Sequence, residues 1–257
     1  MKIIKYILSF FKKKNPTIVF FSDTHSKHDE LILPDADIAI CCGDISRNGS
    51  RTQVTDFMNW FTKQPHKYKI MIAGNHDFWF EPGHPRNFAL MEGENPRDIV
   101  PDNITYIENE TIEVMGIKIF GSPWTPWFHS WAFNAMRGDE IQKHWDLIEK
   151  DTDIVIAHGP PANTYLDRCR KGDRVGCANL ARTLADIQPK ICAFGHIHEA
   201  YGQEDKEILD FDNPDKKGKI IKLINCSVLN LQYEMQNAPV VINWKDMCEM
   251  YENKKEE

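Results

Sequence analysis

The chain has 257 residues, of which 42% are hydrophobic and 27% are charged, as is usual for a folded domain with a sizeable core. Its net charge of −7 gives no strong nucleic-acid signal, because general nucleic-acid-binding proteins usually carry a basic excess. The seven cysteines include no CxxC pair, which argues against a disulfide framework and favours a reducing, cytoplasmic compartment. No stretch reaches the length needed to span a bilayer.

The first 16 residues form a basic and apolar arm that precedes the predicted domain at 17–245. Its apolar residues fall at helical spacing with lysines on the other side: Ile3, Ile4, Ile7, Leu8 and Phe11. One interpretation of residues 1–14 is an amphipathic helix in peripheral contact with an anionic membrane. The other is an arm packed on the domain, which we favour because so short a helix is marginal alone.

Five apolar runs, each followed by a cluster of Gly, Asp, His or Asn, predict the central strands: 17–25, 37–44, 69–77, 153–160 and 190–198. Each run is continuous rather than alternating, as expected of a strand that is covered on both faces. Helices are expected between them at 52–63, 139–150 and 178–187. This order predicts one α/β domain.

A β-hairpin is expected over 104–122, with Met115 and Gly116 in its turn. Two late strands follow at 219–227 and 239–244, after a polar loop at 204–219. The charged tail at 246–257 ends in a segment, 249–257, that we expect to be frayed.

Metal-ligand side chains follow each of the five runs, and open α/β sheets place their ligand sites at the carboxyl ends of strands. Asp23 and His25 are two residues apart, so an extended backbone directs both side chains to the same side. Gly43 allows the chain to turn close to a bound ion before Asp44. The predicted ligands are Asp23, His25, Asp44, Asn75, His158, His196 and His198.

Two aspartates, four histidines and one asparagine are too many donors for one four-coordinate zinc ion. We expect two divalent cations with one bridging carboxylate, Mn²⁺ first and Fe, Zn²⁺ or Mg²⁺ as alternatives. Such a pair stabilises both the attacking and the leaving oxygen of a phosphoryl displacement. Each motif alone is more often a turn or a helix cap, but five in order, each after an apolar run, favour a metal site.

The motifs DTH (23–25), GD (43–44), GNHD (74–77), HG (158–159) and GHIH (195–198) resemble the calcineurin-like metallophosphoesterase superfamily. The early DTH, the aromatic stretch 120–134 and HGPP (158–161) are most similar to its metallophosphoesterase domain-containing (UPF0046) group. The resemblance implies a central two-sheet β sandwich flanked by helices, with the metal site at strand C-terminal ends. It further implies that Asp44 bridges one metal bound by Asp23, His25 and His198 and another bound by Asn75, His158 and His196.

The resemblance also implies two catalytic residues that are not ligands. His76 matches the histidine that protonates the leaving-group oxygen, a role that suits an imidazole near neutral pH. Asp77 is expected to orient that imidazole, or to cap a helix. The expected activity is hydrolysis of a phosphodiester, with a nucleotide or cyclic nucleotide favoured. The alternatives are a phosphomonoesterase, a nuclease and a non-catalytic metal-binding scaffold, in falling order.

Three features bear on the substrate without assigning its binding residues. The segment 123–133 holds three tryptophans and two phenylalanines, which suit either stacking on a nucleobase or packing in a core or a dimer interface. Arg47 could pair with a phosphate oxygen, although a surface turn is the simpler interpretation. The basic segment 168–177 could attract an anionic substrate or form an ordinary solvated loop. Oligomeric state is left open.

Overall fold

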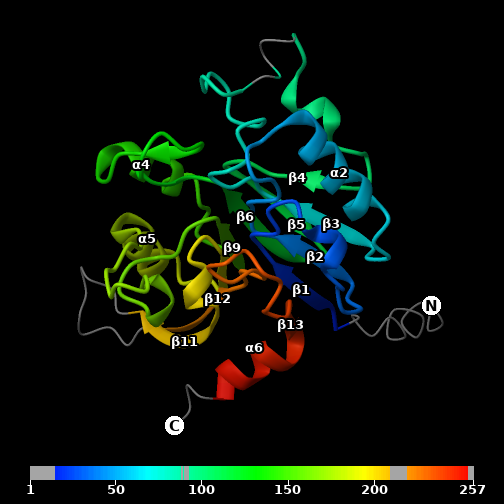
Figure 1. The fold of residues 1–257 in the computed structure, drawn as a ribbon. Helices are drawn as coiled ribbons and strands as arrows, with labels where there is room; N and C mark the ends of the chain where they lie inside the picture. The colour runs from blue at the N-terminus through cyan, green and yellow to red at the C-terminus, as the bar shows by residue number, and fades with distance from the viewer. Residues whose placement is uncertain (1–14, 88, 90–92, 209–218, 254–257) are drawn as a thin grey trace, which may run out of the picture.

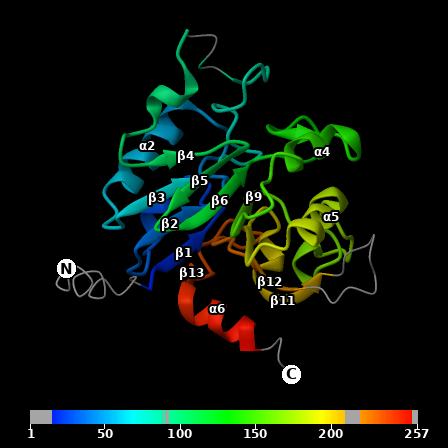
Figure 2. The same ribbon diagram turned by 180° about the vertical axis from the view of Figure 1, so that it is seen from behind.

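The computed structural model describes residues 15–87, 89, 93–208 and 219–253. Two main sheets lie face to face, and helices cover their outer faces (Figures 1 and 2). The predicted α/β fold with a two-sheet sandwich is confirmed. The expected N-terminal arm at 1–14 lies outside the described residues.

The first sheet has five strands in the order β13-β1-β2-β3-β4, and its bounds are β1 Thr17–Phe21, β2 Ile38–Cys41, β3 Tyr68–Met71, β4 Thr105–Tyr106 and β13 Val240–Asn243. The second has six strands in the order β11-β12-β10-β9-β6-β5, and its bounds are β5 Glu110–Val114, β6 Ile117–Ser122, β9 Ile154–Ala157, β10 Ile191–Phe194, β11 Gly202–Ile208 and β12 Lys219–Asn225.

The remaining elements lie around these sheets. A small parallel pair is formed by β7 Thr125–Pro126 and β8 Asn134–Ala135. The α-helices are α2 Arg51–Thr62, α4 Asp139–Trp145, α5 Ala178–Ile187 and α6 Trp244–Asn253. Short 3-10 helices are η1 His28–Glu30, η2 Pro96–Ile99, η3 Tyr165–Asp167 and η4 His198–Ala200.

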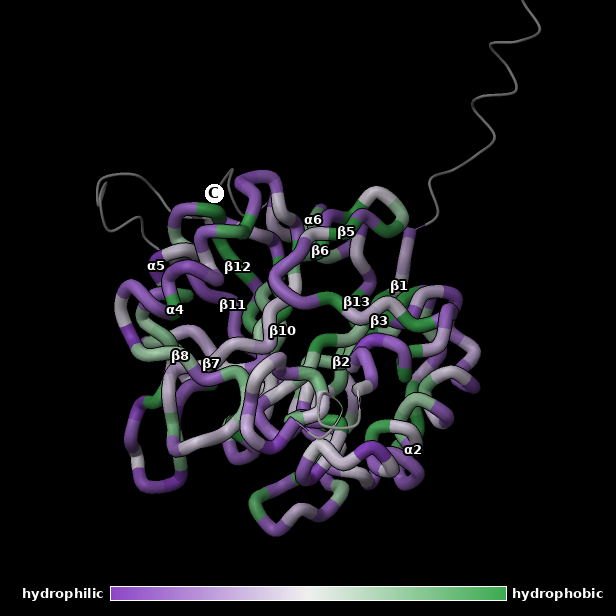
Figure 3. Tube along the Cα trace, turned by 90° about the horizontal axis from the view of Figure 1, so that it is seen from above, coloured by the Kyte–Doolittle hydropathy of each residue, from purple (hydrophilic) through white to green (hydrophobic). Residues whose placement is uncertain are grey.

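The central strands are buried on both faces, which explains their continuous apolar sequences. One face of each sheet packs against the other sheet, and this layer includes Ile18 and Phe20 of β1 and Ile154 and Ile156 of β9. The outer face of the first sheet packs on α2, and that of the second packs on α4 and α5. Figure 3 shows hydrophobic segments concentrated along the strands.

Parallel pairing brings the carboxyl ends of the central strands to one edge of each sheet. β1, β2, β3 and β4 are parallel, as are β6, β9, β10 and β12. Antiparallel strands occupy the outer positions β13, β5 and β11. The loops after β1, β2, β3, β9 and β10, where the sequence predicts the metal ligands, can therefore meet at one place.

The predicted hairpin is confirmed over 110–122 as β5 paired with β6 in antiparallel register, whereas residues 105–106 of the expected range form β4 in the other sheet. Met115 and Gly116 both have positive φ angles, 54° and 79°. Two such residues in succession form the turn whose twist matches that of the flanking strands.

Three expected boundaries differ from the structure. Part of the polar loop at 204–219 forms β11, because an edge strand with a solvated side tolerates its polar sequence while pairing with β12. Residues 249–253 are helical rather than frayed, since α6 buries Met247 and Tyr251, which lie four positions apart. Helix α4 ends at Trp145 instead of continuing to 150, and the next turn tightens as the Ile148 amide bonds to the Trp145 carbonyl. Among the described helices, none has the length and apolar character of a membrane span.

Candidate metal centre

The predicted ligand side chains project from sharp turns at the strand ends. Asp23, His25, Asp44 and His196 all have positive φ angles between 41° and 69°, a region that residues other than glycine rarely adopt. Such strained backbone persists where the surroundings enforce it, and it gathers at functional sites. Gly195 has no room for a Cβ, which would overlap the Asp23 carboxylate. The turns are therefore built to bring polar side chains close together.

The structure brings six of the seven predicted ligands, together with His76, into three overlapping groups. The ligand atoms within each group lie within 4.8 Å of one another: Asp23, His25 and His198; His25, Asp44 and His76; and Asp44, His158 and His196. The seventh, Asn75, places its Oδ1 2.9 Å from the Nε2 of His158. His25 and Asp44 each belong to two groups, so the three form one continuous cluster.

The two carboxylates are arranged alike. The Asp44 Oδ1 accepts the His76 backbone N–H at 2.8 Å, and its Oδ2 lies 3.6 Å from His25 Nε2 and 3.3 Å from His158 Nε2. The Asp23 Oδ2 accepts the Ser227 hydroxyl at 2.7 Å, and its Oδ1 lies 3.5 Å from His198 Nε2. The His196 amide also donates to both Asp23 oxygens, at 3.1 and 3.0 Å. Each carboxylate is thus anchored by protein donors and directs one oxygen at imidazole nitrogens.

The orientation of the His25 and His198 imidazoles shows how the cluster could hold a cation. Their Nδ1 atoms face the carbonyls of Ser46 at 3.2 Å and Asn230 at 3.1 Å. A carbonyl can only accept, so both Nδ1 atoms carry the proton in the neutral rings. Their Nε2 atoms therefore face each other at 3.2 Å, and a proton or another cation between them is needed to make this contact favourable. Backbone carbonyls commonly orient metal-binding histidines in this way.

His158 has the same arrangement. Its Nδ1 donates to the Cys42 carbonyl at 2.9 Å, which leaves Nε2 facing the acceptor oxygens of Asn75 and Asp44. Burial alone would lower the pKa of His158, but the Asp44 carboxylate overrides it and raises the pKa to about 9. Burial would also lower the pKa of His198, but the Asp23 carboxylate outweighs it and raises that pKa to about 9. Burial instead lowers the pKa of His25 and of His196 to about 4. The fit to divalent cations rests on the donor set itself, in which carboxylate oxygens and imidazole nitrogens lie within 4.8 Å of one another.

A family model described as calcineurin-like phosphoesterase matches residues 16–200, which include every predicted ligand. The chain belongs to this family. Its members are metallophosphoesterases that use divalent metals, and the Asp/His cluster could bind such metals.

Similar proteins agree with this assignment. The human metallophosphoesterase domain-containing protein 1 is 35% identical over 246 residues, covering 88% of this chain and 70% of that protein. A UPF0046 protein of Caenorhabditis elegans is 31% identical over 242 residues, covering 86% of this chain and 58% of its own length. One solved structure, 13% identical, superposes with a TM-score of 0.58 over 89% of this chain and 99% of that chain, which shows a shared fold.

His76 lies at the edge of the Asp/His cluster of this metallophosphoesterase and is partly exposed. Its Nδ1 lies 2.7 Å from the Arg47 carbonyl and must donate to it, so Nε2 is the nitrogen free to act on a ligand. Its ring centroid is 4.2 Å from that of Trp131 and 4.6 Å from that of His25. Backbone and packing thus hold this imidazole in one orientation.

Asp77 does not orient His76, which corrects the expected role. Its buried Oδ1 accepts the Ser46 amide at 3.0 Å and the Ser46 hydroxyl at 2.7 Å. Its Oδ2 accepts the amides of Ile45 at 3.2 Å and Gly74 at 2.8 Å. These donors belong to the two loops that carry Asp44 and His76. Asp77 joins the loops through these four hydrogen bonds, three from backbone amides and one from the Ser46 hydroxyl, and it caps no described helix.

Replacing Asp77 with asparagine should destabilise the metal-free protein. The amide has one acceptor oxygen, so its NH₂ group would face buried N–H donors that lose their partner. An unsatisfied buried group costs about 1–3 kcal/mol. Urea unfolding would measure this loss, with Asp102→Asn on an exposed turn as the matched control. An unchanged unfolding midpoint in Asp77→Asn would contradict the joining role. Burial and the neighbouring Asp44 carboxylate together raise the pKa of Asp77 to about 6.

Sequence analysis missed two residues beside the cluster. The Tyr233 ring centroid lies 4.9 Å from that of His25 and 5.4 Å from that of His198. Ser227 donates its hydroxyl to Asp23. Ser227 follows β12 at the carboxyl end of a predicted strand, so the strand-end rule could have found it. Tyr233 lies in an irregular loop that carries no recognisable motif.

The aromatic segment divides between core and surface. Phe133 is buried, and Trp124 is half-buried with its ring 4.1 Å from that of His144. Trp127 and Phe128 are 56% and 59% exposed. The Arg47 guanidinium lies 5.7 Å from the Tyr233 ring, beside the cluster. One part of the aromatic segment is thus packed in the core, and another part is exposed.

Proposed function

We propose that this metallophosphoesterase is a phosphodiesterase that binds two divalent cations and acts on a nucleotide or cyclic nucleotide. The observation that carries the proposal is the position of Asp44. One of its oxygens lies between the Nε2 atoms of His25 and His158, which belong to different ligand groups. A carboxylate oxygen between two groups is what a bridged pair of cations requires.

Asp44 would be shared by two cations, and the other ligands divide according to their neighbours in the structure. Asp23, His25 and His198 would hold one, and Asn75, His158 and His196 the other. The bound cations would supply Lewis acidity and charge neutralisation for attack on a phosphoester. Their mixed oxygen and imidazole ligands favour Mn²⁺, with Fe, Zn²⁺ and Mg²⁺ as alternatives.

His76 would act as the general acid. Its Nδ1 is committed to the Arg47 carbonyl, so the proton for the leaving oxygen would come from Nε2. The Trp131 ring packs against this imidazole and prevents it from turning away. The His76 amide also donates to Asp44, so the general acid and the shared carboxylate are held at a constant spacing.

Aromatic side chains near His76 support a nucleotide substrate. Trp131 lies against His76, and the exposed Trp127 and Phe128 extend the same segment towards solvent. Every nucleobase has a π-face that can stack on such rings. The phosphodiester would then lie at the cluster and the base against the 123–133 segment.

A comparison of bis-p-nitrophenyl phosphate with p-nitrophenyl phosphate tests the proposal. Protein stripped of metal by a chelator and then supplied with Mn²⁺ should hydrolyse the diester at least about tenfold faster than the monoester. The stripped protein should be inactive, and a panel of nucleotides with 2′,3′- and 3′,5′-cyclic forms would then rank the natural class. A clear preference for the monoester would overturn the diester assignment, and no hydrolysis with any of the four metals would support the scaffold alternative.

A further inference from the structure

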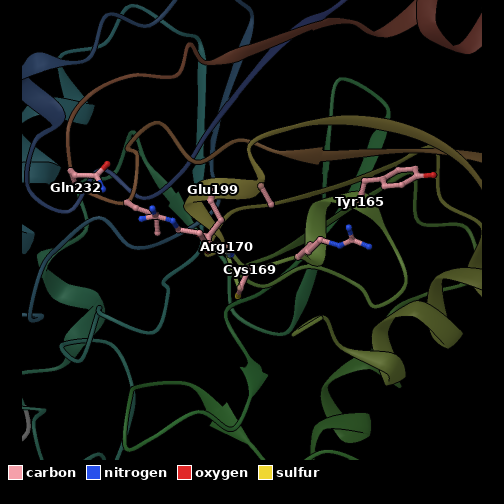
Figure 4. Close-up of a pocket in the computed structure, with 8 residues that line it drawn as sticks. Tyr165, Cys169, Arg170, Glu199 and Gln232 are labelled. Atoms are coloured by element: carbon pink, nitrogen blue, oxygen red, sulfur yellow. Dashed lines mark hydrogen bonds between the residues drawn. The ribbon is translucent and has the colours of Figure 1, made fainter. Parts of the chain in front are cut away.

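Figure 4 shows a cavity of about 560 Å³, two of whose lining residues are next in sequence to residues at the candidate metal centre. It is formed by η3 and the loop after it, by η4 and by the 231–232 segment. Glu199 in its wall follows His198 directly, and Gln232 precedes Tyr233, whose ring contacts His198. A ligand whose phosphoester lies at the cluster would therefore have this cavity within reach of its organic part.

Two arginines line this cavity without ion-pair partners of their own. Arg168 and Arg170 are exposed, and within the described part of the chain neither guanidinium has a carboxylate or an aromatic ring against it. The neighbouring Arg174 differs, because it pairs with Asp167 at 2.8 Å and donates to the Thr164 carbonyl at 2.7 Å. Arg174 therefore has a structural role, whereas the guanidinium groups of Arg168 and Arg170 remain available to a ligand.

The backbone that presents these arginines is well defined. The Arg170 amide donates to Glu199 Oε1 at 2.7 Å, which ties the loop to η4 next to the metal centre. Arg168 forms a β-bridge with Arg174, and the Cys169 amide donates to the Asp173 carbonyl at 2.9 Å. Glu199 is the one carboxylate among the lining residues, and one of its oxygens is held by this amide. Two guanidinium groups therefore outweigh one carboxylate in the cavity wall.

The chemistry of the remaining lining residues is mixed. Tyr165 and Leu231 are 76% and 40% exposed and provide apolar surface in the cavity. Figure 4 places Tyr165 and Gln232 at opposite ends, with Arg170 and Glu199 between them. The cavity therefore suits a ligand that has an apolar or neutral linking portion and an anionic end.

We propose that this cavity binds a second anionic group, a phosphate or a carboxylate, carried by the organic part of the phosphoester substrate. The planar guanidinium fork binds both groups through paired charge-assisted hydrogen bonds. This inference rests on the proposed function, because it assumes that a phosphoester occupies the metal cluster. It narrows the nucleotides of the proposed function to those that carry a second anionic group beyond the scissile phosphodiester, which leaves out the simple cyclic mononucleotides.

Non-hydrolysable phosphonates test the proposal by binding alone. Isothermal titration of the Mn²⁺-loaded protein would compare three series with three to eight carbons: n-alkylphosphonates, alkane-α,ω-bisphosphonates and ω-phosphonoalkanoates. At the best chain length, the bisphosphonate or the phosphonoalkanoate should bind at least about tenfold tighter than the matched alkylphosphonate. A larger gain for one series identifies the second group as phosphate or carboxylate. The gain should shrink at high salt, because the arginines are exposed.

Variants connect this gain to the arginines. In the double variant Arg168→Gln/Arg170→Gln the gain should disappear, while the alkylphosphonate binds as it does to the wild type. Arg182→Gln, an equal charge change on the exposed side of α5, should retain the full gain. Equal affinities at every chain length, or a gain that survives the double variant, would overturn the proposal.

Hydrolysis of bis-p-nitrophenyl phosphate by the same preparations separates this inference from the proposed function. If the protein hydrolyses the diester but the second anion gives no gain in affinity, the cavity proposal is wrong and the proposed phosphodiesterase activity stands. An arginine-dependent gain in a protein that hydrolyses no ester would leave the cavity as an anion site and remove the proposed activity.

Discussion

Replacing His76 with asparagine should slow the hydrolysis of diesters with alkoxide leaving groups by about 10²–10⁴-fold, the usual contribution of a positioned general acid. Diesters that release p-nitrophenolate should be affected far less, since a good leaving group needs little protonation. The reason is structural: the Arg47 carbonyl binds Nδ1, so Nε2 is the one nitrogen able to protonate the leaving oxygen. Values of kcat for a series of leaving groups would give a steeper dependence on leaving-group pKa in the variant.

His129→Asn is the matched control for this series. His129 lies in the same aromatic segment and has a positive φ of 55°, a conformation that asparagine tolerates. It belongs to none of the three ligand groups. Its variant should keep the wild-type dependence on leaving group. Equal rate losses for p-nitrophenolate and alkoxide esters in the His76 variant would show that His76 is not the acid.

Replacing Asp44 with asparagine should remove most of the bound metal. It should also lower the rate of phosphodiester hydrolysis by at least about 10³-fold. Oδ2 lies between His25 and His158, whereas an amide offers one neutral oxygen that cannot compensate two positive ions. Elemental analysis after metal loading should find about two Mn²⁺ ions per wild-type chain and one or fewer in the variant. The pKa of His158 in the metal-free protein should also fall from about 9, because the Asp44 carboxylate is what raises it against burial.

Asp29→Asn provides the control for metal content. Asp29 is exposed in η1, a short helix that follows the turn carrying Asp23 and His25. The same chemical change there should leave both metal content and rate at wild-type values. Two tightly bound Mn²⁺ ions in Asp44→Asn would show that this carboxylate is not shared between them.

Most of the cluster was predictable from sequence, and the structure explains why. Each predicted ligand lies within a few residues of a buried strand, and parallel strands bring their carboxyl ends to one edge whatever the loops between them do. Asp23 and His198 are 175 residues apart, yet their side chains lie 3.5 Å from each other because the loops after β1 of the first sheet and β10 of the second meet at the site. A correct prediction of strand order was not needed for this result.

The role of Asp77 was not predictable in the same way. Adjacency in the GNHD motif suggested that Asp77 orients His76, but neighbouring residues in a tight turn need not point the same way. Its carboxylate instead binds Ile45, Ser46 and Gly74, two of which come from the preceding loop. The group that orients His76 is the backbone carbonyl of Arg47, which no side-chain pattern reveals.

The sequence alone predicted the fold class, the order of the central strands along the chain and the candidate metal-ligand donors that the structure brings together. It could do so because continuous apolar runs, turn residues and donor side chains are local properties that are visible in a few consecutive residues. Tertiary structure decided what surrounds those donors: the carbonyls that orient each imidazole, Tyr233 against His25 and His198, and the arginine-lined cavity beside η4. These depend on contacts between distant segments, and their geometry follows from how the two sheets pack rather than from any local pattern.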